Sequence, residues 1–167
     1  MELKKESFTI KKGLDIQLEG EAVRNLKTHL SSKSYIFPTD FRWFVPKLLV
    51  KEGDPVTVGT PLFCKKTDER VCVVSPVNGK ITQIVRGEKR VLEVIEIENE
   101  ATSIPKRCEI PENLSSSIIQ SLMLQNGLWP MLRQRPFSVI PSPDKKPKSL
   151  FISCFDSSPL APDFFFL

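Results

Sequence analysis

The middle of the chain, from Lys47 to Glu98, alternates apolar and polar residues in short runs that each end at a turn residue. The apolar positions are rich in valine and isoleucine, and Gly or Asn-Gly recurs between the runs at short intervals. Alternation with a period of two predicts β-strands, because successive side chains of a strand point to opposite faces. The pattern therefore predicts a small all-β unit, with its clearest strands at 61–64, 71–74, 81–85 and 91–97.

The order of two phrases in this stretch narrows the fold. V-x-x-G-D-x-V-x-x-G-x-P-L begins at Val50, and S-P-V-x-G-x-I-x-x-I-x-x-G begins at Ser75. Together they resemble the barrel-sandwich hybrid unit of biotinyl and lipoyl carrier domains and of several non-carrier proteins. The glycines suit tight reversals that need a positive φ. The same scaffold serves many tasks, so the phrases predict a fold and leave the function open.

The residues before this unit have weaker patterns. Strands are expected at 7–10 and 14–18, and a short helix or a loop at 21–30. The segment 35–46 is dense in aromatic residues. An aromatic cluster can be a binding face, but we favour core packing where a loop folds over one end of the barrel.

Beyond residue 100 the β pattern ends, because nine of the fourteen prolines lie there. The segment 113–126 predicts a helix, with Pro111 and Glu112 in its first turn and Gly127 as its C-terminal stop. Its expected apolar face is formed by Leu114, Ile118, Ile119 and Leu122. A turn and a further short helix are expected in 127–137.

The last part of the chain is a polar link followed by an apolar run. Residues 149–155 are almost continuously apolar, which is typical of a strand buried on both faces in a parallel α/β sheet. The chain stops twelve residues later, so we interpret this run as the first strand of an incomplete domain. The predicted organisation is a hybrid domain at 1–110, a helical and Pro-rich connection at 111–148, and the start of a truncated Rossmann-like α/β domain at 149–167. The fold class is therefore mainly β (α+β).

Composition excludes several kinds of function. Apolar residues make up 40% of the 167-residue chain and charged residues 26%, which are ordinary globular values. The net charge of +4 comes from interspersed charges, without the basic and aromatic pattern of nucleic-acid binding. No apolar segment follows Met1 as in a signal peptide, and no run approaches the ~20 residues that span a bilayer. We expect a protein that is cytosolic or peripheral to a membrane from its cytosolic side.

The cysteines and the single histidine do not indicate a metal site. Cys64, Cys72, Cys108 and Cys154 are widely spaced, and His29 is the only histidine. Iron–sulfur and structural zinc sites use clustered thiolates, so we expect these cysteines to be small buried residues in a reducing cytosol. His29 is expected to be a solvated surface residue.

Five segments then occur in an order that resembles one family. They are Gly13 to Ile16 after a basic pair, the hybrid phrases, Arg86 to Arg90, Gly127 to Pro130 with Gln134 to Phe137, and Phe155 to Asp163. This series is similar to the N-terminal part of the A subunit of the sodium-translocating NADH:quinone oxidoreductase. The likeness covers nearly the whole chain, and its later segments are specific to the family. The final Phe164 to Leu167 departs from the family's continuation.

The resemblance implies membership of a membrane-bound complex that oxidises NADH, reduces ubiquinone and exports Na⁺. Members of this family are implied to be peripheral cytoplasmic subunits with neither flavin nor metal centre, while NADH, FAD, FMN, riboflavin and iron–sulfur centres belong to partner subunits. The expected partners are the other subunits, especially an integral membrane subunit, with ubiquinone near that junction. Family members are longer and continue with Rossmann-like, β-grasp-type and helical parts.

The residues themselves agree with a non-redox role. Asp156 to Pro159 follow the expected last strand, where a Rossmann-like fold would place its Gly-rich phosphate loop, and they contain no glycine. We therefore assign no catalytic, cofactor-binding or metal-binding residue. This chain is expected to act as a scaffold and assembly part of the reductase, as a non-redox subunit.

Two other functions stay open. A biotin or lipoyl carrier needs a lysine at a hairpin tip, yet counting back from Pro76 reaches Asp68, and neither Lys65 nor Lys66 has carrier-type flanks. A hybrid-domain interaction module in another assembly is the second alternative.

Three residues are candidates for a face near the partner or the quinone: Trp129, Arg133 and Arg135. The plainer interpretation, which we favour, is a packed indole and cations that face the C-terminal end of a helix. If the contact role holds, Trp129→Ala should weaken assembly more than it unfolds the hybrid domain.

Overall fold

The computed structural model describes residues 9, 25, 27, 29, 31–100 and 109–153. The expected strands at 7–10 and 14–18 and the expected short helix or loop at 21–30 lie almost entirely outside the described residues. Cys108, Cys154 and the segment beyond residue 153 also lie outside them. Residues 29–147 pack as one compact unit.

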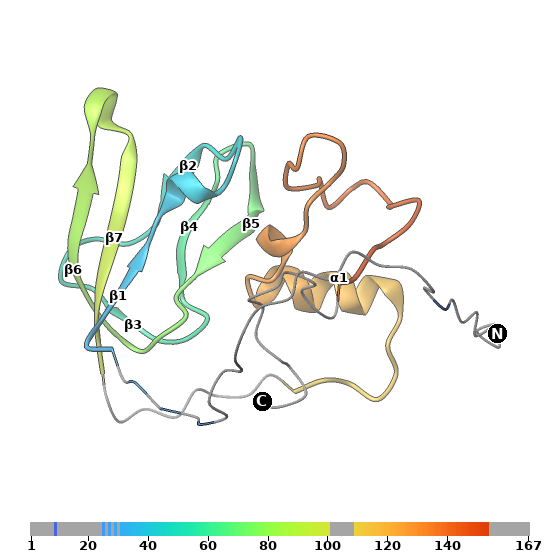
Figure 1. Cartoon of the computed structure of the whole chain (residues 1–167), viewed down its shortest axis with the longest axis horizontal. Coiled ribbons are helices and arrows are strands. Elements are labelled where there is room, and N and C mark those ends of the chain that lie inside the picture. Colours follow the sequence, from blue (N-terminus) through green and yellow to red (C-terminus); the bar gives the residue numbers. More distant parts are fainter. Residues whose placement is uncertain are drawn as a thin grey trace. The chain divides into compact units, whose positions relative to one another are not determined.

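This unit is built on two antiparallel sheets (Figure 1). The four-stranded sheet has the order β1-β7-β6-β3, and the three-stranded sheet has the order β2-β4-β5. The strands are β1 (Lys33–Ile36), β2 (Pro46–Leu48), β3 (Pro55–Val56), β4 (Pro61–Lys65), β5 (Asp68–Val74), β6 (Gly79–Arg86) and β7 (Leu92–Asn99). The predicted mainly-β fold class is confirmed, with β4 to β7 close to their expected places.

Two of the reversals in the described chain lie at the glycines of the first phrase. Gly53 and Gly59 have φ of +92° and +90°, a region that L side chains rarely adopt. The Gly53 N–H donates to the carbonyl of Ile81 at 2.8 Å, and the Ile81 N–H donates to the carbonyl of Asp54 at 3.0 Å. These two bonds join the first phrase to the second, which explains why both occur together in the sequence.

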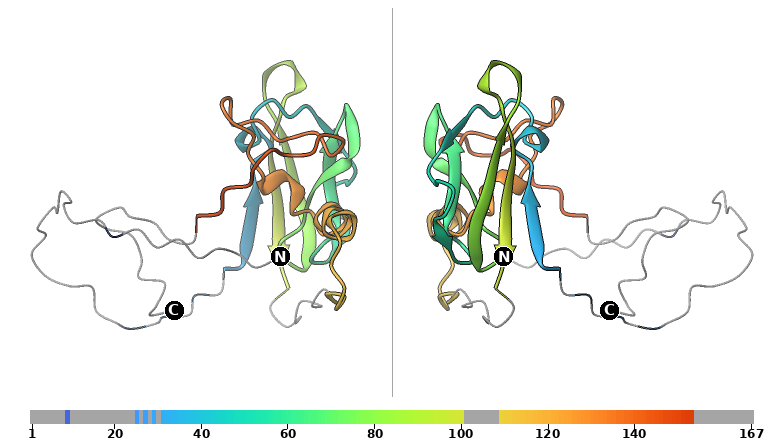
Figure 2. Two further views of the ribbon diagram at one scale, coloured as in Figure 1. Left: turned by 90° about the vertical axis from the view of Figure 1, so that its right-hand side faces the viewer. Right: turned by 90° about the vertical axis from the view of Figure 1, so that its left-hand side faces the viewer.

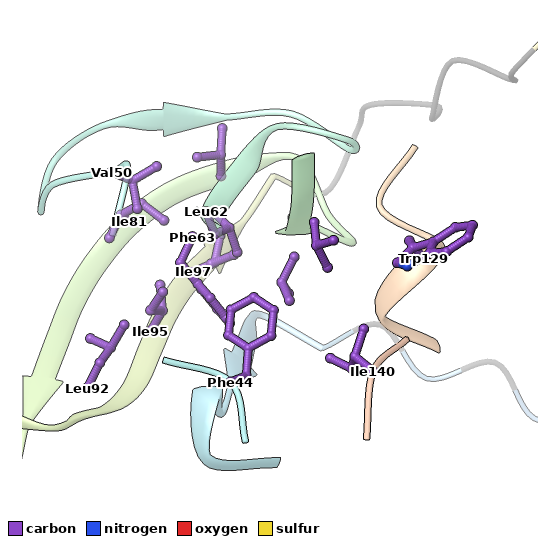
Figure 3. Packing of buried hydrophobic residues seen from close by; sticks show 13 residues of the cluster. Phe44, Val50, Leu62, Phe63, Ile81, Leu92, Ile95, Ile97, Trp129 and Ile140 are labelled. Atoms are coloured by element: carbon purple, nitrogen blue, oxygen red, sulfur yellow. The ribbon is translucent and has the colours of Figure 1, made fainter. Parts of the chain in front are cut away.

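The core lies between the two sheets (Figure 3). Its side chains come from the strands, from Phe44 and Val50 on either side of β2, and from two residues of the segment after the strands. Its buried members are Phe44, Val50, Val56, Leu62, Phe63, Val71, Val73, Ile81, Leu92, Ile95, Ile97, Trp129 and Ile140. Because Trp129 and Ile140 belong to this cluster, the segment expected as a connection packs onto the hybrid core.

The aromatic segment before β2 mostly joins this core. Phe41, Phe44 and Phe63 form a triangle with ring centroids 5.6–5.9 Å apart, and edge-to-face packing joins Phe63 to the other two. The short 3₁₀ helix η1 (Pro38–Asp40) leads into this triangle. The preference for core packing is therefore right for Phe41 and Phe44, whereas Trp43 points elsewhere and is 73% exposed.

Helix α1 (Ser116–Gln125) confirms the predicted helix but starts later than expected. The Ser115 side chain accepts from the Ile118 N–H, so this hydroxyl is the N-cap and Pro111 and Glu112 lie outside the helix. The predicted stop is right: Gly127 has φ of +66° and donates to Leu124, and Leu128 donates to Met123.

The buried face of α1 differs from the expected one. Met123 and Leu124 pack against the core, while Leu114, Ile118 and Ile119 are 51%, 37% and 43% exposed. Gly127 fixes this orientation by close approach, because a Cβ there would lie 2.5 Å from a methyl group of Val74 in β5. After the helix, η3 (Trp129–Met131) forms the expected further short helix.

Only the first part of the expected last strand, residues 149–153, is described. These residues form no helix or strand, and Leu150, Phe151 and Ile152 are 63%, 94% and 77% exposed. A buried strand needs neighbouring strands on both sides, and the described residues provide none here. The start of a Rossmann-like domain at this point stays a prediction.

The expectation of free cysteines is wrong for one pair. Cys64 of β4 and Cys72 of β5 are joined by a disulfide. A regular two-residue turn at Lys66 and Thr67 would place Cys64 opposite Glu69, but a register shift in β5 places it opposite Cys72. The shift is a β-bulge-type irregularity with no marker such as glycine, so residue spacing alone did not reveal the pairing.

Candidate functional site

A surface cavity of about 400 Å³ lies between two turns of the compact unit. Its lining residues are Arg42, Trp43, Pro136, Phe137 and Val139. We call three exposed residues of this lining, Arg42, Trp43 and Phe137, the aromatic surface. One wall is the turn 41–45, and the other is the turn 134–139, which is nearly a hundred residues later in the chain.

In the first wall, phenylalanines before and after the exposed tryptophan pack into the core. Phe41 and Phe44 pack against Phe63, and the Phe44 N–H donates to the Phe41 carbonyl at 3.1 Å. Between them Trp43 has φ of +60°, in the left-handed region that residues with a Cβ rarely occupy. Because both neighbours are held inside, the indole is directed outward in spite of this strain.

The second wall is a tight hairpin-like turn. Gln134 and Val139 form an isolated antiparallel bridge, and the Gln134 N–H donates to the Val139 carbonyl at 2.8 Å. Ser138 inside the turn has φ of +56°, and Phe137 beside it is 72% exposed. Ile140 is buried in the core directly after the turn, so the wall has a fixed base.

Side-chain bonds hold the segment behind the second wall. The Trp129 indole N–H donates to the carbonyl of Pro141 at 2.9 Å, and the Gln120 amide donates to the carbonyl of Pro143 at 2.5 Å. The segment is also tied to β5 by an ion-pair network centred on Arg70. Helix α1, η3 and β5 therefore position Phe137 together.

The Arg70 guanidinium binds two carboxylates in bidentate fashion. Its donor–acceptor distances are 2.7 and 2.8 Å to Asp68 and 2.8 and 2.9 Å to Asp144. The hydrogen bonds from Arg70 lower the pKa of both carboxyl groups, and they raise the pKa of Arg70 above its already high value. Asp144 lies in the segment after the second wall, so the network links that segment to the β4–β5 hairpin.

A pH dependence of stability follows from the lowered carboxyl pKa values. A carboxyl whose folded pKa is depressed stabilises the fold above its unfolded pKa of about 4, and this contribution is lost as the pH falls through the folded value. We expect Arg70→Gln to be less stable than the wild type at pH 6, with the difference narrowing below about pH 4. Urea unfolding across this range measures it, with Arg70→Lys as the control that keeps the charge. A difference that does not vary with pH would contradict the role of the network.

The chemistry of the aromatic surface is that of a binding site. Its lining residues carry two aromatic rings and one guanidinium, and they include no carboxylate, histidine or thiol that could act as a nucleophile or a general base. Exposed Trp, Phe and Arg side chains are enriched at the centres of protein interfaces. These side chains also suit a ligand with a planar conjugated ring and oxygen acceptors. The aromatic side chains can stack on the ring, and the guanidinium can donate hydrogen bonds to the oxygens.

The three residues singled out from the sequence have different positions. Trp129 is only 8% exposed and has its N–H bonded inside, which is the packed position that we favoured. The Arg133 guanidinium donates to the carbonyls of Pro130 and Leu132 at the end of η3, as expected for a cation near a helix C-terminus. Arg135 is exposed and lies in the second wall, next to Pro136.

The residues that form the aromatic surface itself were not assigned from the sequence. Trp43 was included in a segment expected to be core, and Phe137 was noted only as part of a family motif. A signal for Trp43 existed, because Arg42 and Trp43 interrupt the apolar pattern between Phe41 and Phe44. No local signal indicated that residues 42 and 137 line one cavity, since this arrangement depends on the packing of the segment after α1.

Other candidate sites can be placed as well. Lys66 is exposed in the two-residue turn between β4 and β5, although counting back from Pro76 had pointed to Asp68. Within residues 31–100 and 109–153, no three His, Cys, Asp or Glu side chains gather in a way that could hold a metal ion. In the same residues, no helix has the length and apolarity needed to cross a bilayer.

Comparisons with known proteins agree with this architecture. Residues 8–100 match the family described as the NqrA N-terminal barrel-sandwich hybrid domain, and residues 114–167 match the NqrA second alpha/beta domain. The second match begins inside the segment expected as a connection, close to the start of α1.

Individual relatives carry one name, that of the A subunit of Na(+)-translocating NADH-quinone reductase. The relative from Yersinia pseudotuberculosis serotype O:1b (strain IP 31758) is 38% identical over 163 residues, and that from Haemophilus influenzae (strain PittEE) is 37% identical over 161. The relative from Pseudomonas aeruginosa (strain UCBPP-PA14) is 33% identical over 159. The alignments cover 92–93% of this chain and 36% of each relative, so the chain spans about a third of their length. The chain belongs to the NqrA family, the A subunits of Na(+)-translocating NADH-quinone reductase.

Proposed function

We propose that this chain is a scaffold and assembly part of a Na⁺-translocating NADH:ubiquinone reductase complex. In this role it binds neighbouring subunits and carries no redox centre. NADH, the flavins and the iron–sulfur centres would be held by the partner subunits. The family membership supports the proposal, and so does the cavity lining, whose exposed aromatic and cationic side chains are of the kind found at protein interfaces.

The aromatic surface is the part of the chain that we propose as the contact. Arg42, Trp43 and Phe137 are exposed on a rigid base, and the two turns that carry them hold left-handed residues at Trp43 and Ser138. Such strain persists only where surrounding structure enforces it, and it is concentrated at functional sites. The proposed partner is an integral membrane subunit, which the chain would meet on the cytoplasmic side of the membrane.

The same surface is our candidate for proximity to quinone. Trp43 and Phe137 offer faces for a quinone ring, and Arg42 offers donors for its carbonyl oxygens. Arg135, in the second wall, adds a second cation on the rim. The relatives' name includes quinone reduction, which supports quinone as the ligand class.

The test is the double variant Trp43→Ala/Phe137→Ala in the complex purified from its own membranes. Both side chains are exposed, so the free energy of unfolding of the subunit should change by less than about 0.5 kcal/mol. Retention of the subunit by the detergent-solubilised complex should fall, and KM for a soluble ubiquinone analogue should rise. Val58→Ala, an exposed apolar residue at the β3–β4 turn, is the control and should change neither.

Two outcomes distinguish the parts of this proposal. If retention falls while KM stays constant in the remaining complex, the surface is an assembly contact without a role in quinone binding. If neither quantity changes, the aromatic surface has no role in the complex, and the proposed function loses its support from the structure.

One observation favours the carrier alternative: Lys66 lies at an exposed hairpin tip. Carrier domains present their modified lysine at such a tip, but the flanking residues Lys65 and Thr67 do not match the carrier pattern. The intact mass of the protein isolated from its source separates the two functions. A biotinyl or lipoyl adduct on Lys66 would replace the scaffold proposal by a carrier, whereas an unmodified lysine supports the scaffold.

A further inference from the structure

The hairpin of β6 and β7 reaches beyond its neighbouring strands. Figures 1 and 2 show its tip rising past the ends of the other strands. The pairing explains this, because β1 pairs only with residues 95–98 of β7 and β3 pairs only with residues 79–80 of β6. The backbone pairing of the outer half of the hairpin is therefore confined to its own two strands, which pair out to Arg86 and Leu92, and Leu92 anchors this half in the core.

The backbone of the tip is closed and strained. The Gly87 N–H donates to the Val91 carbonyl at 2.8 Å, and the Arg90 N–H donates back to the Gly87 carbonyl at 3.2 Å. Lys89 and Arg90 have φ of +53° and +61°, so two consecutive residues with long side chains lie in the left-handed region. Residues with a Cβ are disfavoured there, and Gly, Asn or Asp would suit this turn better.

The side chains at the tip are mainly cationic. Arg86, Lys89 and Arg90 are exposed, and none of the ion pairs among the described residues involves them. Among the described residues, the Arg86 guanidinium donates to the carbonyl of Arg90, at 3.4 Å. Two carboxylates lie nearby: Glu88 in the turn, and Glu93, whose side chain covers Gly87. Three cations against two acids leave a local charge of +1, and within the described residues the three cationic heads are free of ion pairing.

Two ordinary explanations for these cations are weaker. Lysines on sheet edges prevent unwanted strand pairing, but Lys89 and Arg90 lie in the turn, beyond the last paired residues, where no strand edge needs protection. Insertion into a lipid surface calls for Trp, Phe or Leu beside the cations. The tip has only Val91, which is 52% exposed.

We propose that the tip, residues 86–90, binds carboxylates on the surface of a partner protein. This contact is separate from the aromatic surface and uses ionic rather than apolar recognition. Hydrogen bonds from arginine and lysine heads to carboxylates are charge-assisted, and such contacts set the orientation of docking and its salt dependence. The proposal rests on the proposed function, because the partner is taken to be another protein of the reductase complex.

Carbodiimide cross-linking of the native complex tests the proposal directly. The reagent joins an amine to a carboxylate that touches it, so Lys89 should be found by mass spectrometry in an amide with an Asp or Glu of another protein. A Lys89 that is joined only to Glu88 or Glu93, or that stays unjoined while other lysines react, would overturn the proposal. The cross-linking result does not depend on the outcome for the Trp43→Ala/Phe137→Ala double variant.

Charge reversal provides a second, quantitative test. Lys89→Glu/Arg90→Glu should weaken retention of the subunit several-fold at low salt, and the loss should shrink as salt rises. Lys51→Glu/Lys80→Glu makes the same charge change near the opposite end of β6 and should leave retention unchanged. Equal losses in both double variants would contradict the proposal. So would co-sedimentation with phosphatidylserine vesicles that is lost only in the tip variant, because the ligand would then be a lipid headgroup.

Discussion

Trp129→Ala should lower the free energy of unfolding by about 3–5 kcal/mol, the range for removal of a buried tryptophan. The side chain is 8% exposed, belongs to the central hydrophobic cluster and bonds through its indole N–H to Pro141. Removing it leaves a cavity and an unpaired carbonyl, and it detaches η3 from β5. Chemical denaturation followed by circular dichroism measures the loss.

This result would also decide between two interpretations of Trp129. The sequence allowed it to be a contact residue, in which case the substitution weakens assembly more than folding. Its burial gives the opposite expectation, that assembly fails only because the fold is weakened. Trp129→Phe, which keeps most of the apolar volume and loses the N–H bond, should recover much of the stability and assembly together. Normal stability of Trp129→Ala with poor assembly would contradict this.

Phe63→Ala is the second substitution with a large expected effect, again about 3–5 kcal/mol. Phe63 is fully buried and packs at 5.6 Å from the ring of Phe44 and at 5.9 Å from that of Phe41. Both partners hold the turn that carries Trp43. The variant should therefore lose stability and also release the strained Trp43 turn.

The two effects of Phe63→Ala are measured separately. Thermal unfolding gives the stability, and the fluorescence anisotropy of Trp43, in a Trp129→Phe background, reports the turn. Phe63→Leu keeps much of the volume and should show a smaller change in both. A stable Phe63→Ala protein with unchanged anisotropy would show that the aromatic triangle does not position the aromatic surface.

Much of the sheet structure was predictable, because local patterns determine it. The strands β4 to β7 follow from alternation with a period of two, and the reversals at Gly53 and Gly59 follow from the need for positive φ. The end of α1 followed from Gly127 in the same way. These features depend on residues close together in the chain, where spacing carries the information.

Features that depend on tertiary packing were missed. The Cys64–Cys72 disulfide needs a register shift that the sequence does not mark, and the burial of Met123 instead of Ile118 needs the contact between Gly127 and Val74. The aromatic surface is the clearest case. Trp43 is exposed because its neighbours Phe41 and Phe44 take the core positions. The wall that carries Phe137 is placed by the contacts of α1, η3 and β5 with the segment around it.

The central claim is that the aromatic surface contacts another component of the reductase. A photo-reactive benzoylphenylalanine placed at position 43, in the complex purified from its own membranes, tests it most directly. Illumination should join the chain to an integral membrane subunit, and the cross-link should be absent when the reagent is placed at position 58. Equal cross-linking from both positions, or none from position 43 in an intact complex, would contradict the claim.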